Sequence, residues 1–474
     1  MSTNNLPVAV IGSGPVGLAA AAHLITRGVP VRLYESGKSV ASNVRSWGHV
    51  RLFSPWRFNI DLAAGNMLRE HGWQEPSPEA MPTGRELVDA YLEPLAQLPA
   101  IASIIQTNTQ VQAITRQGID KVVTRDRDTR PFALTVQNGS GGPRVDLARA
   151  VIDASGTWQS PNPLGASGVM AIGETAFADR IAYGIPDVLG SERSTYAGKI
   201  VLVIGGGHSA ANALLDLSRL ASKDPALRMI WAVRGKSLVR VFGGGVADKL
   251  PARGKLGSDL EALVASGALQ LVLGFAAERV EERGGGLIVS GQTPEGFRTL
   301  DPVDRIIVAT GQRPDLALTR ELRLDLDPWL ESPRALGPSI DPNLHSCGSV
   351  PPHGYRELAH PEANYFSVGI KSYGRAPTFL MATGYEQVRS VAAYLAGDIE
   401  AANDVRLVLP ETGVCSVTLA ADAETSGCCG GPAPVSSDAC CSDDAIAKAA
   451  GAAGCGCSQK PEAVTPKAKA ACCG

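Results

Sequence analysis

Short apolar runs alternate with alanine- and leucine-rich segments at the start of the chain. Residues 8–11 form an apolar run, rich in β-branched residues and followed by a glycine, which is typical of a parallel strand buried on both faces. Residues 16–26 have the composition of a helix, and residues 29–34 form a second apolar run. Strand, tight turn, helix and strand in this order predict a right-handed βαβ unit of a doubly wound sheet.

The same pattern recurs in the middle of the chain. Residues 200–204 are a predicted strand, residues 209–220 a predicted helix, and residues 228–233 a second strand. Because the same elements return in the same order, the sequence predicts two dinucleotide-binding units. The expected fold class is therefore α/β, with two Rossmann-type domains.

Three further strands are expected outside these units. A strand at 151–153 ends in Ala-Ser-Gly-Thr, and one at 305–308 ends in Ala-Thr-Gly. We expect these two similar turns where the chain passes between the two nucleotide domains. A strand at 365–368, followed by a helix that begins near Thr378, is expected to return to the first domain.

The turn after the first strand has the spacing of a phosphate cradle, G-x-G-x-x-G. The first glycine allows a tight turn, the second lets the backbone approach a pyrophosphate, and the third lets the helix pack closely on the strand. An acid that ends the next strand can accept the ribose hydroxyls. We assign to this cradle Gly12, Ser13, Gly14, Pro15, Gly17 and Glu35.

The second cradle departs from the first in two places. Alanine stands at its third glycine position, and its second strand ends in Arg234 instead of an acid. An arginine can pair with a 2′-phosphate, so this cradle favours NADPH over NADH. We assign to it Gly205, Gly207, His208, Ser209 and Arg234, with His208 as a hydrogen-bond donor and no catalytic residue named.

With two cradles and two similar turns, the chain resembles the flavoproteins with two dinucleotide-binding domains, over roughly residues 6–400. These include thioredoxin-reductase-like enzymes and flavin-containing monooxygenases. The resemblance implies FAD on the first cradle and a nicotinamide nucleotide on the second. It also implies that Gly311 belongs to the second crossover segment and that Trp47 lies near the flavin, with plain core packing as the alternative for Trp47.

The resemblance implies a domain organisation as well. The FAD domain is expected to be discontinuous, at 1–190 and 300–405, with the NAD(P)H domain at 191–299. Residues 406–474 are dominated by small residues and cysteine, which predicts a disordered, Cys-rich tail.

Three departures from the family's motifs bear on the reaction. The chain has no cysteine before Cys347, so the redox cysteine pair of the disulfide-reducing members is lacking. The acid of the family's final glycine-aspartate motif is also missing around residues 367–371. The monooxygenase fingerprint expected before the second cradle is not intact, and residues 182–186 stand there instead.

Nine of the ten cysteines lie from Cys415 onward, and eight of them form close pairs. Paired thiolates suit soft ions such as As(III), Hg(II), Cu(I) or Zn(II), although the C-x₂-C spacing of structural zinc modules is absent. The alternative is a low-complexity tail without a function. The metal ligands predicted here are Cys428, Cys429, Cys440, Cys441, Cys455, Cys457, Cys472 and Cys473.

Composition narrows the remaining possibilities. Of the 474 residues 44% are hydrophobic, and the net charge of −3 gives no reason to expect nucleic acid or an anionic membrane as a partner. No run of about 18 apolar residues predicts a membrane span, and no signal peptide is recognised. We expect a cytoplasmic enzyme with a small-molecule substrate. The sequence allows a homodimer but does not determine the oligomeric state.

Three functions remain open at this point. The first is an FAD-dependent, NAD(P)H-dependent oxidoreductase of monooxygenase type, similar to flavoproteins associated with arsenic resistance. The second is an NADPH-dependent reductase of a metal ion or disulfide that the tail presents. The third is a soft-metal-binding or sensing protein on a flavoprotein scaffold.

Overall fold

A computed structural model of the chain describes residues 5–139, 141–243, 251–342, 350–407 and 448. Apart from Lys448, these residues lie within Met1–Ser416, which forms one compact unit. The predicted cysteine ligands, together with Cys347 and Cys415, lie outside the described residues.

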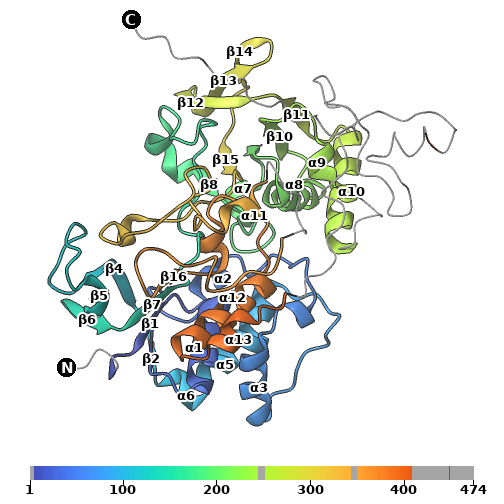
Figure 1. Cartoon of the computed structure of the whole chain (residues 1–474). Coiled ribbons are helices and arrows are strands. Elements are labelled where there is room, and N and C mark those ends of the chain that lie inside the picture. Colours follow the sequence, from blue (N-terminus) through green and yellow to red (C-terminus); the bar gives the residue numbers. More distant parts are fainter. Residues whose placement is uncertain (1–4, 140, 244–250, 343–349, 408–447, 449–474) are drawn as a thin grey trace, which may run out of the picture. The chain divides into compact units, whose positions relative to one another are not determined.

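The first cradle belongs to a five-stranded parallel sheet (Figure 1). Its order is β16 (Tyr365–Ser367), β7 (Ala150–Asp153), β1 (Val8–Ile11), β2 (Val31–Tyr34) and β3 (Ile105–Gln106). All four residues of β1 are buried, because strands pair on both of its sides: Val8 lies opposite Val31 of β2 and Ala150 of β7. The predicted return of the chain to this sheet is confirmed, because β16 pairs with β7.

Helices α1 (Pro15–Thr26) and α12 (Met381–Leu395) lie side by side against this sheet (Figure 1). Most of α1 is alanine, leucine and glycine, and nine of its residues are buried. Small side chains let the helix approach its neighbours closely. The other helical segments of this region are α2 (Ser42–Ser46), η2 (Trp56–Phe58), α3 (Leu62–Glu70), α4 (Gly84–Leu87), η3 (Val88–Leu92), α5 (Glu93–Gln97), α6 (Pro99–Ala102), η8 (Gly369–Tyr373) and α13 (Ile399–Asn403).

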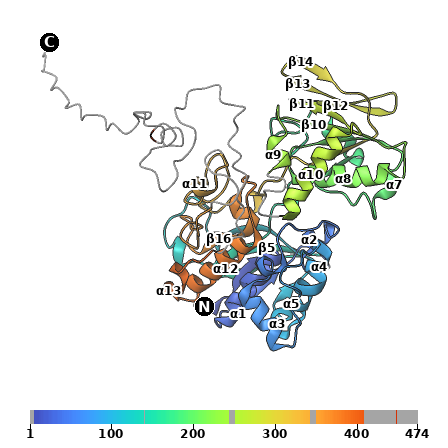
Figure 2. The same cartoon turned by 90° about the vertical axis from the view of Figure 1, so that its right-hand side faces the viewer.

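The second cradle belongs to another five-stranded parallel sheet. Its order is β11 (Gln270–Leu273), β10 (Arg228–Val233), β9 (Ile200–Ile204), β15 (Arg305–Val308) and β8 (Ile181–Tyr183). Helices α8 (His208–Ala221) and α10 (Pro251–Ala265) pack against each other beside this sheet (Figure 2). The remaining helical segments here are η5 (Glu174–Arg180), α7 (Arg193–Tyr196) and α9 (Val239–Phe242).

The second sheet extends beyond the limits 191–299 that the sequence predicts. Both β8 and β15 lie outside those limits, yet β15 pairs with β9 and β8 pairs with β15. Leu164 and Ala171 also pack into the core of this sheet. Strands from both sides of 191–299 thus join this sheet, because an apolar run in the sequence does not show which sheet it pairs with.

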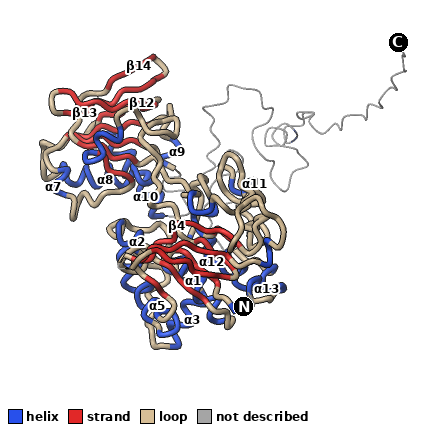
Figure 3. The backbone as a smooth tube through the Cα atoms, turned by 90° about the vertical axis from the view of Figure 1, so that its left-hand side faces the viewer, coloured by secondary structure: helices blue, strands red, loops and turns tan. Residues whose placement is uncertain are grey.

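Two three-stranded antiparallel sheets were not expected from the sequence; strands are red in Figure 3. One contains β4 (Thr109–Arg116), β5 (Phe132–Asn138) and β6 (Pro143–Ala148), and the other β12 (Ala276–Arg283), β13 (Gly286–Thr293) and β14 (Gly296–Thr299). Three further short helices complete the described elements: η4 (Arg127–Thr129), η7 (Ala317–Thr319) and α11 (Gly337–Ile340). In the part of the chain that the structure describes, no helix is long and apolar enough to cross a membrane.

Candidate cofactor-binding cavity

The first cradle has the close packing that its glycines predict. Gly12 has a φ of +94°, and a Cβ there would lie 2.7 Å from the carbonyl oxygen of Ala154. A Cβ on Gly17 would lie 1.9 Å from the carbonyl oxygen of Gly12. A Cβ on Gly14, in contrast, would meet no atom within 4 Å. Gly14 is also the N-cap of α1, and no side chain caps this helix, so its first N–H groups remain open to a phosphate.

Glu35 stands at the end of β2 and is nearly buried. One carboxylate oxygen accepts hydrogen bonds from the backbone N–H and the hydroxyl of Ser13, at 3.1 and 2.6 Å. The other accepts from the Gly37 N–H at 2.8 Å and from the Ser42 hydroxyl at 2.7 Å. Four donors therefore fix the carboxylate at the wall of the cavity described below, and the Ser13 hydroxyl points at Glu35.

The second cradle repeats this geometry in part. Gly205 has a φ of +138°, and a Cβ there would lie 2.2 Å from the carbonyl oxygen of Ala309. Each cradle therefore packs its first glycine against the alanine of a crossover turn, Ala154 or Ala309. Gly207 is the uncapped N-cap of α8, with open space where a Cβ would lie. Its third position is Ala210, which is fully buried.

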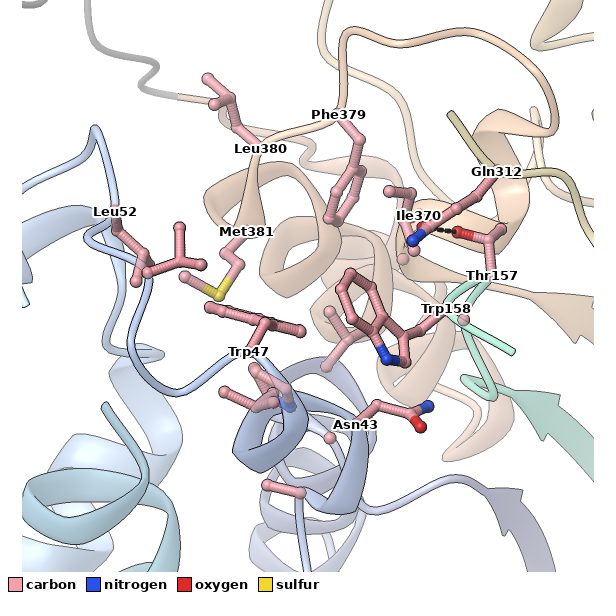
Figure 4. Close-up of a pocket in the computed structure, with 18 of the residues that line it drawn as sticks. Asn43, Trp47, Leu52, Thr157, Trp158, Gln312, Ile370, Phe379, Leu380 and Met381 are labelled. Atoms are coloured by element: carbon pink, nitrogen blue, oxygen red, sulfur yellow. Dashed lines mark hydrogen bonds between the residues drawn. The ribbon is translucent and has the colours of Figure 1, made fainter. Parts of the chain in front are cut away.

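The two cradles border one cavity of about 530 Å³. Gly12, Gly14 and Glu35 line it from the first cradle, and His208 and Ser209 line it from the second. Among the residues that the structure describes, most of the remaining wall is apolar. The side chains of the wall that are labelled in Figure 4 are Asn43, Trp47, Leu52, Thr157, Trp158, Gln312, Ile370, Phe379, Leu380 and Met381.

Trp47 is part of this wall, as the resemblance implies. Its ring lies 6.4 Å from that of Trp158, at an interplanar angle of 54°. Gly84 makes room for it, because a Cβ there would lie 2.7 Å from the Trp47 ring. Figure 4 shows Met381 over one side of Trp47 and Trp158 beside it. Two indoles and a thioether thus give this part of the wall an apolar surface that a ring system can contact.

A buried ion pair lies at the carboxyl end of β7. The ammonium of Lys371 donates to Asp153 at 2.7 Å and to the Ser155 hydroxyl at 3.0 Å, and both charged groups are almost completely buried. Burial opposes ionisation of Asp153, but the charge of Lys371 and hydrogen bonds from Lys371 and Ser155 outweigh it and lower the pKa of the carboxyl. The hydroxyl of Tyr365 also donates a hydrogen bond to Asp153, at 3.1 Å. This pair stands where the family's final acid is missing.

Of the remaining predicted cofactor-binding residues, Pro15 and Trp47 line the cavity. The others do not line it; these are Ser13, Gly17, Gly205, Gly207, Gly311 and Arg234. Arg234 is exposed at the end of β10, where one of its N–H groups donates to the Ala166 carbonyl at 3.0 Å. In the part of the chain that the structure describes, no group of three His, Cys, Asp or Glu side chains could hold a metal ion.

Sequence reasoning missed most of the cavity wall. Asn43, Thr157, Trp158, Gln312 and the segment 377–381 all contribute to it. Thr157 is the last residue of the Ala-Ser-Gly-Thr turn that the sequence singled out, and Trp158 follows it directly, so that turn was the available signal for both. The segment 377–381 carries no motif, and only the fold places it here.

Comparison with known proteins decides the family. Residues 9–332 match the pyridine nucleotide-disulphide oxidoreductases. The chain belongs to this family. Membership, together with the two cradles, confirms the prediction of an oxidoreductase that uses FAD and NADP(H).

Individual relatives are more distant. Over 217 residues the chain is 25% identical to a ferredoxin–NADP reductase of Streptococcus agalactiae, with 45% of this chain and 52% of the relative covered. Over 219 residues it is 29% identical to indole-3-pyruvate monooxygenase YUCCA1 of Oryza sativa subsp. japonica, with 45% of each chain covered. The chain thus spans about half the length of the curated relatives it matches.

A solved structure supports the fold over a longer stretch. The bacillithiol disulfide reductase Bdr of Bacillus cereus superposes with a TM-score of 0.61. The superposition covers 83% of this chain and 99% of that one, at 18% identity. At this identity the likeness shows the fold alone.

The residues present fit both cofactors. Open space at Gly14 and Gly207, each at an uncapped helix start, is what a pyrophosphate needs to approach the backbone. The fixed carboxylate of Glu35 suits the hydroxyl groups of a ribose, whereas the exposed guanidinium of Arg234 suits the negative charge of a 2′-phosphate.

Proposed function

We propose that this chain is an NADPH-dependent flavin monooxygenase that acts on a small molecule. In this reaction NADPH supplies two electrons, one atom of O₂ is inserted into the substrate, and the other leaves as water. FAD, when bound, carries the electrons between the nicotinamide and oxygen. The observation that carries the proposal is the largely apolar cavity that both cradles border, in a chain that has no cysteine before Cys347.

The side chains of the chain have positioning roles in this proposal. The uncapped starts of α1 and α8 hold the two pyrophosphates, Glu35 accepts ribose hydroxyls, and Arg234 pairs with the 2′-phosphate. Trp47, Trp158 and Phe379 exclude water from the space in which the rings meet. No side chain has to act as a nucleophile, so no catalytic residue is assigned.

Family members of known name include both reductases and monooxygenases, so the reaction must be tested directly. We would measure NADPH oxidation and oxygen uptake by the FAD-loaded chain, in air and under argon, with and without arsenite as a probe substrate. Oxygen uptake in step with NADPH oxidation and stimulated by the probe supports a monooxygenase. Turnover under argon on an added disulfide such as oxidised glutathione contradicts it and favours a reductase.

A role in arsenic or other soft-metal resistance is proposed from the cysteine pairs alone. Eight paired cysteines between Cys428 and Cys473 offer thiolates to As(III), Hg(II) or Cu(I). We expect the full chain to bind arsenite, and replacement of all eight cysteines by serine to abolish that binding while FAD content stays unchanged. Equal arsenite binding by both chains contradicts this role. Tight arsenite binding without any NADPH oxidation favours a sensor instead.

A further inference from the structure

Gln312 is held in place by the two crossover segments that follow β7 and β15. The Asn162 N–H donates to the Gly311 carbonyl at 2.9 Å, and the Arg313 N–H donates to the Ser160 carbonyl at 3.0 Å. Pro161 and Gln312 form an antiparallel bridge between the same segments. The backbone of Gln312 is therefore fixed from both sides.

The side chain of Gln312 is oriented as well. The hydroxyl of Thr157, which is only 3% exposed, donates to the Oε1 atom of Gln312 at 3.0 Å. Because the carbonyl end of the carboxamide accepts this bond, its Nε2 end must point elsewhere. Figure 4 shows the carboxamide beside Ile370 and Thr157, with its nitrogen toward the space between Phe379 and Trp158.

The Nε2 group has two N–H donors and no hydrogen-bond partner among the residues that the structure describes. Gln312 lines the cavity, and the labelled side chains nearest to its nitrogen are apolar. Gln312 is half-buried and lines the cavity, so a ligand that displaces water from this space can accept a hydrogen bond from the Nε2 group.

We infer that Gln312 is a positioning residue that donates a hydrogen bond to a carbonyl oxygen or ring nitrogen of a ring system in the cavity. Thr157 acts through Gln312 by fixing which end of the carboxamide faces the ring. The inference rests on the proposed cofactor role of the cavity. Both the flavin ring and the nicotinamide carboxamide offer acceptors of this chemistry, and the test distinguishes them.

The test compares Gln312→Leu, which removes the donor at similar size, with wild type and with Gln110→Leu, an exposed glutamine on β4. Two readouts are taken on full-length protein: the position of the visible absorption band with the dissociation constant of FAD, and the dissociation constant of NADP⁺ from titration. Loss of one such bond corresponds to an affinity loss of about tenfold.

A shifted absorption band and weaker FAD binding in Gln312→Leu, with NADP⁺ binding unchanged, place the acceptor on the flavin. Weaker NADP⁺ binding with an unchanged flavin band places it on the nicotinamide. Values for both ligands that equal those of wild type and of Gln110→Leu overturn the inference. Failure of the wild-type chain to bind FAD instead defeats the proposed function, so the two failures are distinguishable.

Thr157→Val is the second variant, and it keeps Gln312 in place. Without the Thr157 hydroxyl the carboxamide of Gln312 can rotate. The dissociation constant that changes in Gln312→Leu should therefore change in the same direction in Thr157→Val, by a smaller factor of about threefold. If Gln312→Leu folds poorly, this variant still decides the question. An unchanged readout in a folded Thr157→Val protein contradicts the orienting role of Thr157.

Discussion

The two cradles share the packing of their first glycine and differ at their third position and at the end of their second strand. In both, the first glycine packs on the alanine of a crossover turn, at Ala154 or Ala309. The first cradle adds a glycine at its third position and a strand-end acid held by four hydrogen bonds, whereas the second has Ala210 and the exposed Arg234. From this difference we propose that the first cradle suits a permanently held nucleotide and the second one that exchanges.

The crossover turns differ in the same sense. The first is held by the buried pair of Asp153 and Lys371, while the second follows Val308 and, among the described residues, is held by hydrogen bonds to neutral groups around Asn162. We expect the buried pair of Asp153 and Lys371 and the glycine at position 17 to account for the difference between the cradles.

The largest expected effect is that of Asp153→Asn, which leaves the ammonium of Lys371 buried without a carboxylate. Removing one partner of a buried pair costs about 3–5 kcal/mol of unfolding free energy, measurable by urea denaturation with FAD release followed in parallel. Glu331→Gln, which removes the partially exposed pair with Arg375, is the control and should cost about 1 kcal/mol or less. Equal losses of unfolding free energy in the two variants contradict a special role for the buried pair of Asp153 and Lys371.

The same pair predicts a pH dependence. Because the pKa of Asp153 is lowered in the folded chain, its contribution to stability is complete above the unfolded pKa of about 3.9 and is lost as the pH falls through the folded pKa. The unfolding free energy of wild type should therefore approach that of Asp153→Asn only below about pH 4. A difference between them that already disappears at neutral pH contradicts this account.

Next in size is Gly17→Ala, which copies the second cradle into the first. The new Cβ would lie 1.9 Å from the Gly12 carbonyl oxygen, so α1 must shift away from its strand. We expect a cost of about 1–3 kcal/mol and loss of most bound FAD, measured as flavin content per chain. Retention of full flavin content shows that the third glycine is dispensable.

Arg234→Ala is expected to act on one nucleotide only. Loss of a charged hydrogen bond to the 2′-phosphate raises the KM for NADPH about tenfold or more, while the KM for NADH stays the same. Arg228→Ala, an exposed arginine at the opposite end of β10, is the matched control. Equal changes for NADPH and NADH would remove the argument for NADPH.

The smallest effect belongs to Ala210→Gly, the reverse exchange in the second cradle. Glycine inside a helix costs up to about 1 kcal/mol relative to alanine, and the buried methyl group is small. We expect a small fall in thermal stability and little change in the KM for NADPH. A loss as large as that of Gly17→Ala erases the difference between the cradles.

The strands were the most predictable part of the fold. The predicted ranges 200–204, 228–233 and 305–308 coincide with β9, β10 and β15, because buried parallel strands are continuous apolar runs that end at turn residues. Domain limits could not be predicted in this way. They depend on pairing between strands such as β8 and β15, which are far apart in the sequence.

The candidate site likewise has features that the local sequence predicts and features that depend on residues distant in the sequence. Its glycines and Glu35 follow from local spacing, since the turn and the helix start are built from consecutive residues. The absence of the final acid was visible in the sequence, but the pairing of Lys371 with Asp153 was not, because it joins residues 218 positions apart. The orientation of Gln312 likewise depends on Thr157, from a different crossover segment.

The most direct test of the central claim is to mix the FAD-loaded chain with NADPH under argon and follow the visible absorption of the flavin. The account predicts that this band disappears in proportion to the NADPH added and returns when air is admitted. A chain that binds no FAD, or whose bound flavin keeps its absorption in excess NADPH, would contradict a cavity in which the two cradles bring their cofactors together.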